Sequence, residues 1–143
     1  MKTKLSVLFV LSIIAVLIAG CGSAAPTGPV TSALTEEQAR EIAIRALTNG
    51  YNNDDRDAYV VDMDDSMRSA ITADAFVNAI KPYKDAYGNF VSIETAELSP
   101  ANTSGYVRWT FTSKFEKGTL YFLLVFPEDG KKVTGAFLNE VKP

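Results

Sequence analysis

The chain has 143 residues, of which 47% are hydrophobic, a composition that suits one ordinary globular domain. Beyond residue 20 it carries 17 acidic and 12 basic side chains, a net charge of −5, which disfavours nucleic acid and anionic lipid surfaces as partners because clustered Lys and Arg bind both. It contains no histidine and a single cysteine, so an intramolecular disulfide and a thiolate zinc site are excluded, and we expect no metal and no cofactor.

The first predicted element is an apolar segment behind a short positive head. Lys2 and Lys4 form the head, and residues 5–17 are apolar apart from two serines. Small residues then lead to Cys21. This order is typical of a secretory signal peptide. The stretch 5–19 has 15 residues, fewer than the roughly 20 that a membrane-spanning helix needs.

The last four residues of this segment, Ile18-Ala19-Gly20-Cys21, resemble the lipobox of prokaryotic lipoproteins. The resemblance implies that a diacylglyceryl group is added to the thiol of Cys21 and that the chain is cut between Gly20 and Cys21. Acyl chains on Cys21 would then hold the protein on a cell membrane, outside the cytoplasm, with each buried methylene contributing about 0.8 kcal/mol. The alternative is an uncleaved anchor with one span, in which the cysteine is incidental.

A tether follows the cysteine. Residues 22–33 are uncharged and rich in Gly, Pro and other small residues, which is typical of a flexible linker. Such a linker spans at most about 40 Å when extended. We therefore expect a signal peptide over 1–20, a lipidated cysteine with its tether over 21–33, and one domain over 34–143.

The domain is predicted to begin with a helix. Thr35 and Gln38 form a capping box, and apolar residues recur behind it at helical spacing. Asn49-Gly50 ends the helix, and Tyr51 is expected to pack inward. Two ion pairs with i,i+4 spacing are expected on its outer side, Glu36 with Arg40 and Glu41 with Arg45.

Two further helices are predicted before residue 90. One begins in the polar stretch 52–55, and residues 62–66 form another polar break. Thr72 caps the next helix, Pro82 is expected to bend or end it, and Gly88 is expected to stop it. The side chains expected to be buried from this region are Tyr59, Val60, Met63, Met67, Ile71, Phe76, Val77 and Ile80.

From Phe90 onward the hydrophobic period changes from 3.6 to 2, which predicts strands. Hairpin turns are expected at 116–118 and 128–130. The strand between them, Leu120–Phe126, is apolar on both faces, as a covered central strand is. Residues 133–141 complete at least four strands. Odd positions from Val107 to Phe115 share one face, and Arg108, Thr110, Thr112 and Lys114 share the other. Arg108 is expected to be exposed to solvent.

Helices followed by an antiparallel meander define an α+β fold. The order of elements over residues 34–141 resembles the nuclear-transport-factor-2-like, or cystatin-like, superfamily. The landmarks are the first helix, Asn52-Asn53-Asp54, the Ile71-Thr72 junction, Gly88-Asn89-Phe90, Gly118 and Gly130. The resemblance implies that N-terminal helices pack on a curved sheet and form a cone.

Relatives of this kind that are isomerases or dehydratases place Asp, Tyr or His inside the cone. No catalytic residue is predicted here, and the candidate ligand-binding side chains are Tyr59, Tyr83, Tyr87, Trp109 and Ser113, with Tyr106 a further hydroxyl at the cone mouth. Ring packing, with the tyrosine oxygen in water, and a satisfied serine hydroxyl are the favoured explanation of these residues. Two acidic clusters, 54–57 and 62–65, fit no calcium-loop pattern and are interpreted as caps and solvated loops. Asn102-Thr103-Ser104 matches a glycosylation sequon.

Three functions stay open at this point. The first is a non-catalytic module that binds a small apolar ligand or a protein partner outside a membrane. The second is a small acid–base enzyme that uses Asp and Tyr in the cone. The third is a homodimeric structural subunit of the cell envelope, because Tyr121, Leu123 and Val125 need a cover if the other face of their strand meets the helices.

Overall fold

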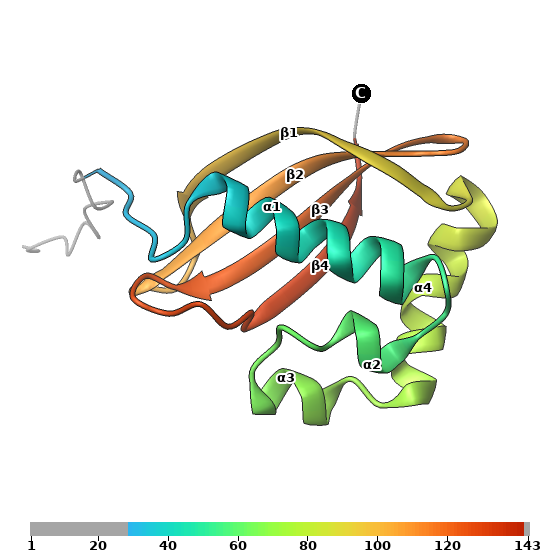
Figure 1. The fold of residues 1–143 in the computed structure, drawn as a ribbon, viewed down its shortest axis with the longest axis horizontal. Helices are drawn as coiled ribbons and strands as arrows, with labels where there is room; N and C mark the ends of the chain where they lie inside the picture. Colours follow the sequence, from blue (N-terminus) through green and yellow to red (C-terminus); the bar gives the residue numbers. More distant parts are fainter. Residues whose placement is uncertain (1–28, 142–143) are drawn as a thin grey trace, which may run out of the picture.

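The computed structural model describes residues 29–141. Helices occupy the first half of this region and a four-stranded antiparallel sheet the second, so the predicted α+β class is confirmed (Figure 1). The predicted signal peptide, Cys21 and most of the predicted tether lie outside the described residues.

The sheet is a meander in which each strand pairs with the next along the chain, in the order β1-β2-β3-β4. Two residues connect β2 to β3, at the predicted hairpin that ends at Gly118, and a longer loop that contains Gly130 precedes β4. The strands are β1 (Phe90–Pro100), β2 (Tyr106–Phe115), β3 (Gly118–Pro127) and β4 (Gly135–Glu140).

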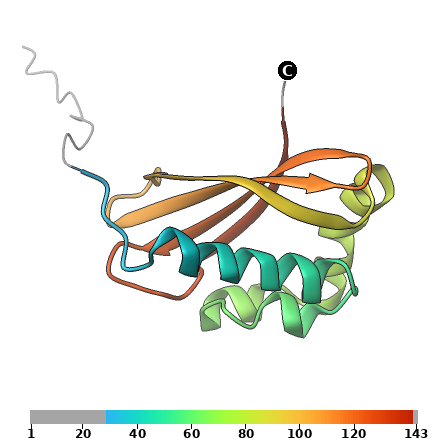
Figure 2. The ribbon, with the colours of Figure 1, turned by 45° about the horizontal axis from the view of Figure 1, so that its top comes forward.

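The two faces of the sheet differ in what covers them. In Figure 2 the helices lie on one side of the sheet and no helix lies on the other. On the helix side, Trp109 pairs across the strands with Leu98 and Leu124, and the predicted alternation of β2 is confirmed. On the side without helices, called the open face below, Arg108 pairs with Ser99 and Val125.

Helix α1 (Glu36–Arg45) begins at the predicted capping box, in which the Thr35 hydroxyl accepts from the Gln38 amide and the Gln38 side chain accepts from the Thr35 amide. It continues into a wider π-helical turn, η1 (Ala46–Tyr51), and Tyr51 is buried as expected. The predicted pair of Glu36 and Arg40 is present at 2.7 Å. The predicted pair of Glu41 and Arg45 is wrong, because Arg45 instead meets Asp62 at 2.8 Å.

The middle helices depart further from the expectation. They are α2 (Arg56–Tyr59), α3 (Asp65–Ala70) and α4 (Ala73–Tyr87). The predicted polar break over 62–66 is wrong in its second half, because Asp64 caps α3 through the Met67 amide at 2.8 Å. Thr72 and Gly88 bound α4 as predicted.

Pro82 does not end α4, and the expectation that Val77 is buried is wrong. The helix continues through Pro82, whose side chain is exposed, so the carbonyl group that Pro82 cannot bond is left on the solvent side, where water can replace the missing donor. Val77 is 47% exposed, because Phe76 and Ile80 already define the inward side of the helix and Val77 lies about 100° around it. Met67 and Ile71 are half-buried rather than buried.

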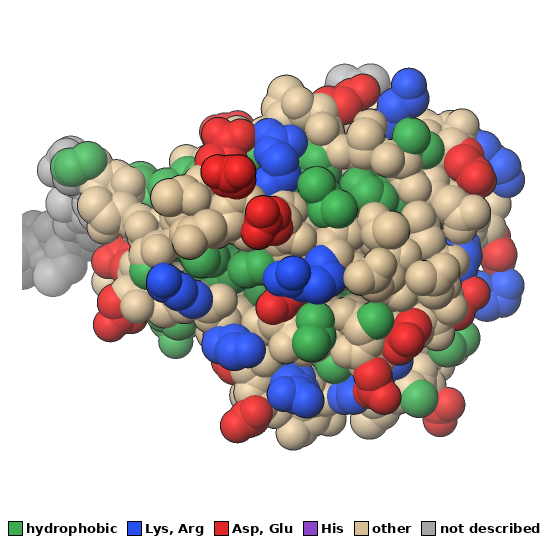
Figure 3. All heavy atoms as spheres, viewed as in Figure 1, with side chains coloured by type: hydrophobic (Ala, Val, Ile, Leu, Met, Phe, Trp, Pro, Cys, Tyr) green, Lys and Arg blue, Asp and Glu red, His purple; other side chains and the backbone are tan. Residues whose placement is uncertain are grey.

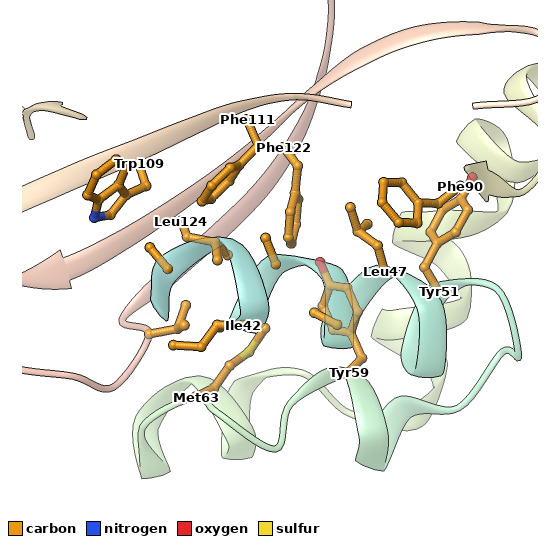
Figure 4. Packing of buried hydrophobic residues seen from close by; sticks show 14 of the residues in the cluster. Ile42, Leu47, Tyr51, Tyr59, Met63, Phe90, Trp109, Phe111, Phe122 and Leu124 are labelled. Atoms are coloured by element: carbon orange, nitrogen blue, oxygen red, sulfur yellow. The ribbon is translucent and has the colours of Figure 1, made fainter. Parts of the chain in front are cut away.

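The core lies between the sheet and the helices. In Figure 4, Phe111 and Phe122 extend from the sheet toward α1, and Tyr59 approaches them from α2. The ring centroids of Tyr59 and Phe122 are 6.4 Å apart. The buried aliphatic residues of α1 and η1 fill the remaining space, so one continuous apolar layer holds the helices on the sheet.

Candidate functional site

Two of the five candidate ligand-binding residues, Ser113 and Trp109, lie on β2 in the packed core, to which Tyr59 of α2 also belongs. Ser113 is fully buried, and its hydroxyl donates to the backbone oxygen of Phe111, 3.3 Å away. Trp109 is 6% exposed and stacks on Phe111 with ring centroids 6.3 Å apart. Apart from the aromatic side chains, Ser113 is the only buried polar or charged residue in the described part of the chain, so no carboxylate is buried beside these residues.

The other three candidates are tyrosines on the helix side of β4. The Tyr83 hydroxyl donates to the backbone oxygen of Leu138 at 2.7 Å, and the Tyr87 hydroxyl donates to a carboxylate oxygen of Glu140 at 3.2 Å. Tyr59 and Tyr83 line one small hollow of about 220 Å³ between α4 and β4. Burial raises the pKa of Tyr59, so this hydroxyl stays neutral at physiological pH. The hydrogen bonds of Tyr83 and Tyr87 fasten α4 to the edge of the sheet, and the five candidates do not gather at one pocket.

A larger hollow, of about 670 Å³, lies on the open face. Alternate residues of β2, β3 and β4 form its floor, because every second side chain of a strand points to the same face. The loop between β1 and β2 and the segment before β4 form its rim. Its lining includes Tyr106, Arg108, Leu123, Val125, Phe137 and Asn139.

Arg108 is the strongest charge in this hollow. Its side chain is half-buried, and its Nε atom is buried without a hydrogen-bond partner. It forms no ion pair within residues 29–141, although the exposed carboxylate of Glu97 belongs to the same face. The prediction that Arg108 lies on the side of β2 opposite the core is confirmed, but the expectation that it is simply exposed is wrong, because its side chain is half-buried next to Val125 of β3.

Polar groups complete the rim of the hollow. Asn102 and Thr103, the first two residues of the glycosylation sequon, line it from the loop between β1 and β2. Asp64 lines it from the start of α3, where its carboxylate is engaged as the helix cap. The hollow thus combines one unpaired cation, one carboxylate that caps a helix, apolar walls and neutral donors and acceptors.

The predicted tether reaches the domain at the end of the sheet where the hollow lies. The backbone nitrogen of Ala33 donates to the oxygen of Glu128 at 2.8 Å, and the nitrogen of Glu128 donates to the oxygen of Gly105 at 3.0 Å. Gly105 closes the loop that supplies Asn102 and Thr103 to the rim. Val30 also packs against the core, so the last residues of the predicted tether already contact the domain.

On the side of the molecule seen in Figure 3, acidic and basic side chains are mixed. Within the described region, no group of three or more His, Cys, Asp or Glu side chains is arranged to hold a metal ion. None of the helices over residues 29–141 is both long enough and apolar enough to span a bilayer.

Comparisons with known proteins do not identify relatives of this chain. No protein-family model matches it, no curated protein matches it, and no solved structure matches it. The interpretation of the site therefore depends on its own geometry.

Tyr106, expected at the cone mouth, lies instead on the open face, and sequence reasoning did not identify the other residues of the hollow as a site. The available signal was the apolar outer row of β3, for which Leu123 and Val125 were expected to need a cover. Arg108 is their neighbour on β2, and it pairs directly with Val125. An arginine that lies opposite an apolar residue on a strand with two apolar faces packs its stem on that residue, so its guanidinium is only partly solvated.

Proposed function

We propose that the protein is a lipid-anchored, non-catalytic binding module that acts outside the cytoplasm. The lipobox at Ile18–Cys21 supports the anchor, and the uncharged linker behind it supports display of a domain at a short distance from a membrane. In this proposal the open face of the sheet is the binding surface.

The observation that supports the binding role is that the interior between sheet and helices is packed, whereas the open face of the sheet has a hollow. A cone enzyme of this kind needs an acid and a base that converge inside the cone, whereas no carboxylate is buried in the described region and the buried Ser113 hydroxyl is satisfied by its own strand. The open face instead offers a concave surface with apolar walls and one unpaired cation, as a ligand site does.

We also propose that the fold is a small variant of the nuclear-transport-factor-2-like cone. Support comes from the element order and from the placement of all helices on one side of a meander. A solved structure of the domain whose helices cover the opposite face of the sheet would contradict this assignment.

The anchor is tested by the Cys21→Ser variant in the cell that makes the protein. We expect the wild-type chain in the membrane fraction as a processed form, and the variant either released or retained as an uncleaved precursor. Ser23→Ala is the matched control, because it changes a nearby small residue and leaves the lipobox intact. Equal processing and equal membrane content of the Cys21→Ser variant and the wild-type chain would contradict the proposal.

A second candidate, a homodimer through the open face, is favoured by one observation. Phe137 is 54% exposed beside the half-buried Leu123 and Val125 on that face. Sedimentation equilibrium decides between the two. A dimer that dissociates on Phe137→Ser would support the structural subunit, and a monomer at high concentration would leave the ligand module.

A further inference from the structure

We propose that the hollow on the open face binds a small organic acid, with the ligand's carboxylate held by Arg108 and its apolar body against β3 and β4. This inference names the ligand of the binding module proposed above and therefore depends on that function. It assigns to Arg108 a direct contact with the ligand.

The unpaired guanidinium of Arg108 defines the anion. A guanidinium presents its two Nη groups in a common plane and direction, and a carboxylate accepts from both through its two oxygens. Arg108 lines the hollow and forms no ion pair in the described part of the chain, and its buried Nε atom lies out of reach of a ligand. A half-buried guanidinium without a partner gains a charge-assisted hydrogen bond when a planar carboxylate in the hollow accepts from its Nη groups.

The walls define the rest of the ligand. Leu123, Val125 and Phe137 provide an apolar surface beside the guanidinium, and Phe137 is the most exposed of them. The volume of about 670 Å³ falls within the range of small-molecule sites, and it exceeds what a single carboxylate occupies. An acid with an aromatic or branched apolar body fits this combination better than a bare anion does.

The other charges of the hollow agree with this assignment. Asp64 is the one acidic side chain of the lining, and its carboxylate accepts the hydrogen bond that begins α3. Arg108 is the one cation of the lining. Arg108 is thus the charged group of the lining whose side chain has no hydrogen-bond partner in the described part of the chain, and a ligand carboxylate supplies one.

The test uses 4-phenylbutyrate as the probe and 4-phenylbutyramide as its neutral counterpart, which has the same body and no charge. The protein is the full-length product in whatever processed form its cell makes, labelled with ¹⁵N and titrated with each probe by NMR. We expect shifts of the amide signals of β2, β3 and β4 around the hollow, and binding of the acid about tenfold or more tighter than binding of the amide.

Variants separate the carboxylate contact from general effects. Arg108→Met is expected to weaken acid binding about tenfold or more and to leave amide binding within twofold. Lys114→Met is the matched control, because it removes a cation from the same face of β2 outside the hollow and is expected to change acid binding less than twofold. Phe137→Ala is expected to weaken both probes.

Equal binding of acid and amide, or amide-signal shifts that lie elsewhere on the domain, would overturn the ligand assignment. Both results can be obtained with the wild-type protein alone. A dimer that buries the open face would also overturn it. Neither result bears on the proposed membrane anchor, which is tested separately at Cys21. Conversely, a protein without the anchor would be expected to give the same acid titration.

Discussion

Asn52 forms two hydrogen bonds with the backbone of Phe90, a residue 38 positions later in the chain. Its side-chain nitrogen donates to the Phe90 oxygen at 3.0 Å, and its side-chain oxygen accepts from the Phe90 nitrogen at 2.8 Å. The amide thus occupies the place of a neighbouring strand at the start of β1. This contact connects the end of η1 with the first residue of the sheet.

Replacing Asn52 by Ala is expected to lower the free energy of unfolding by about 1–3 kcal/mol, because both backbone groups of Phe90 lose their partner. Urea denaturation measures the change. Asn53→Ala is the control, because the Asn53 side chain donates only to exposed carbonyl groups of its own helix end. A loss at Asn53 as large as the loss at Asn52 would show that the contact with Phe90 is unimportant.

Gly50 approaches Tyr59 too closely for any side chain. A Cβ atom at Gly50 would lie 2.5 Å from the Cα atom of Tyr59. Gly50→Ala is therefore expected to cost about 2–3 kcal/mol, because the backbones of η1 and α2 must move apart. Gly105→Ala serves for comparison, since its φ of +82° is strained but no atom lies within 4 Å of the added Cβ. There we expect about 1 kcal/mol, and the reverse order would refute the steric account.

Stability is expected to fall at alkaline pH. Burial raises the pKa of Tyr59 above the ordinary value of 10.0, and burial followed by the charge of Asp54 raises the pKa of Tyr51. Above about pH 10 the unfolded chain releases these protons while the folded chain keeps them, so the free energy of unfolding decreases as the pH rises. Below pH 10 the neutral hydroxyls leave the stability unaffected.

The variant Tyr59→Phe isolates one of these groups. Its free energy of unfolding is expected to decline less steeply above pH 10, by about 1.4 kcal/mol per pH unit, because one proton fewer is involved. Guanidinium denaturation between pH 8 and pH 11 measures the slope. An unchanged slope would mean that the Tyr59 hydroxyl ionises as readily in the folded protein as in the unfolded chain.

Pro82 is expected to destabilise α4, and a substitution can remove this effect. Pro82→Ala restores a backbone donor inside the helix and is expected to raise the free energy of unfolding by about 1–3 kcal/mol. Lys81→Ala, at the neighbouring exposed position, is expected to change it by no more than about 0.5 kcal/mol, since it removes only the exposed pair with Asp85. Calorimetry of the two variants measures both effects, and an unchanged or lower stability of Pro82→Ala would contradict the account.

Local signals predicted most of the fold. The capping box at Thr35, the cap at Thr72, the glycine at Gly88 and the alternation of β2 act within a few residues, so a single sequence contains them in full. The meander follows because each strand pairs with its neighbour along the chain. Whether Pro82 ends or merely bends α4 could not be decided from the sequence, because the cost of a missing hydrogen bond depends on whether the carbonyl reaches water, and the local pattern does not contain that information.

The site was harder to predict for a related reason. Whether Arg108 is solvated depends on the residues opposite it in β3 and on a loop that begins at Ala101, and these meet only when the register of the sheet is known. Likewise Arg45 had a suitable partner in Glu41 at helical spacing, but Asp62 lies closer in the folded chain. Contacts between elements decide both cases.

The proposed lipid anchor is tested most sharply by the mass of the N-terminal fragment of the protein taken from the cell that makes it. We expect a chain that begins at Cys21 and carries a diacylglyceryl group on its sulfur. A fragment that still contains residues 1–20, or one with an unmodified Cys21 thiol, would contradict it.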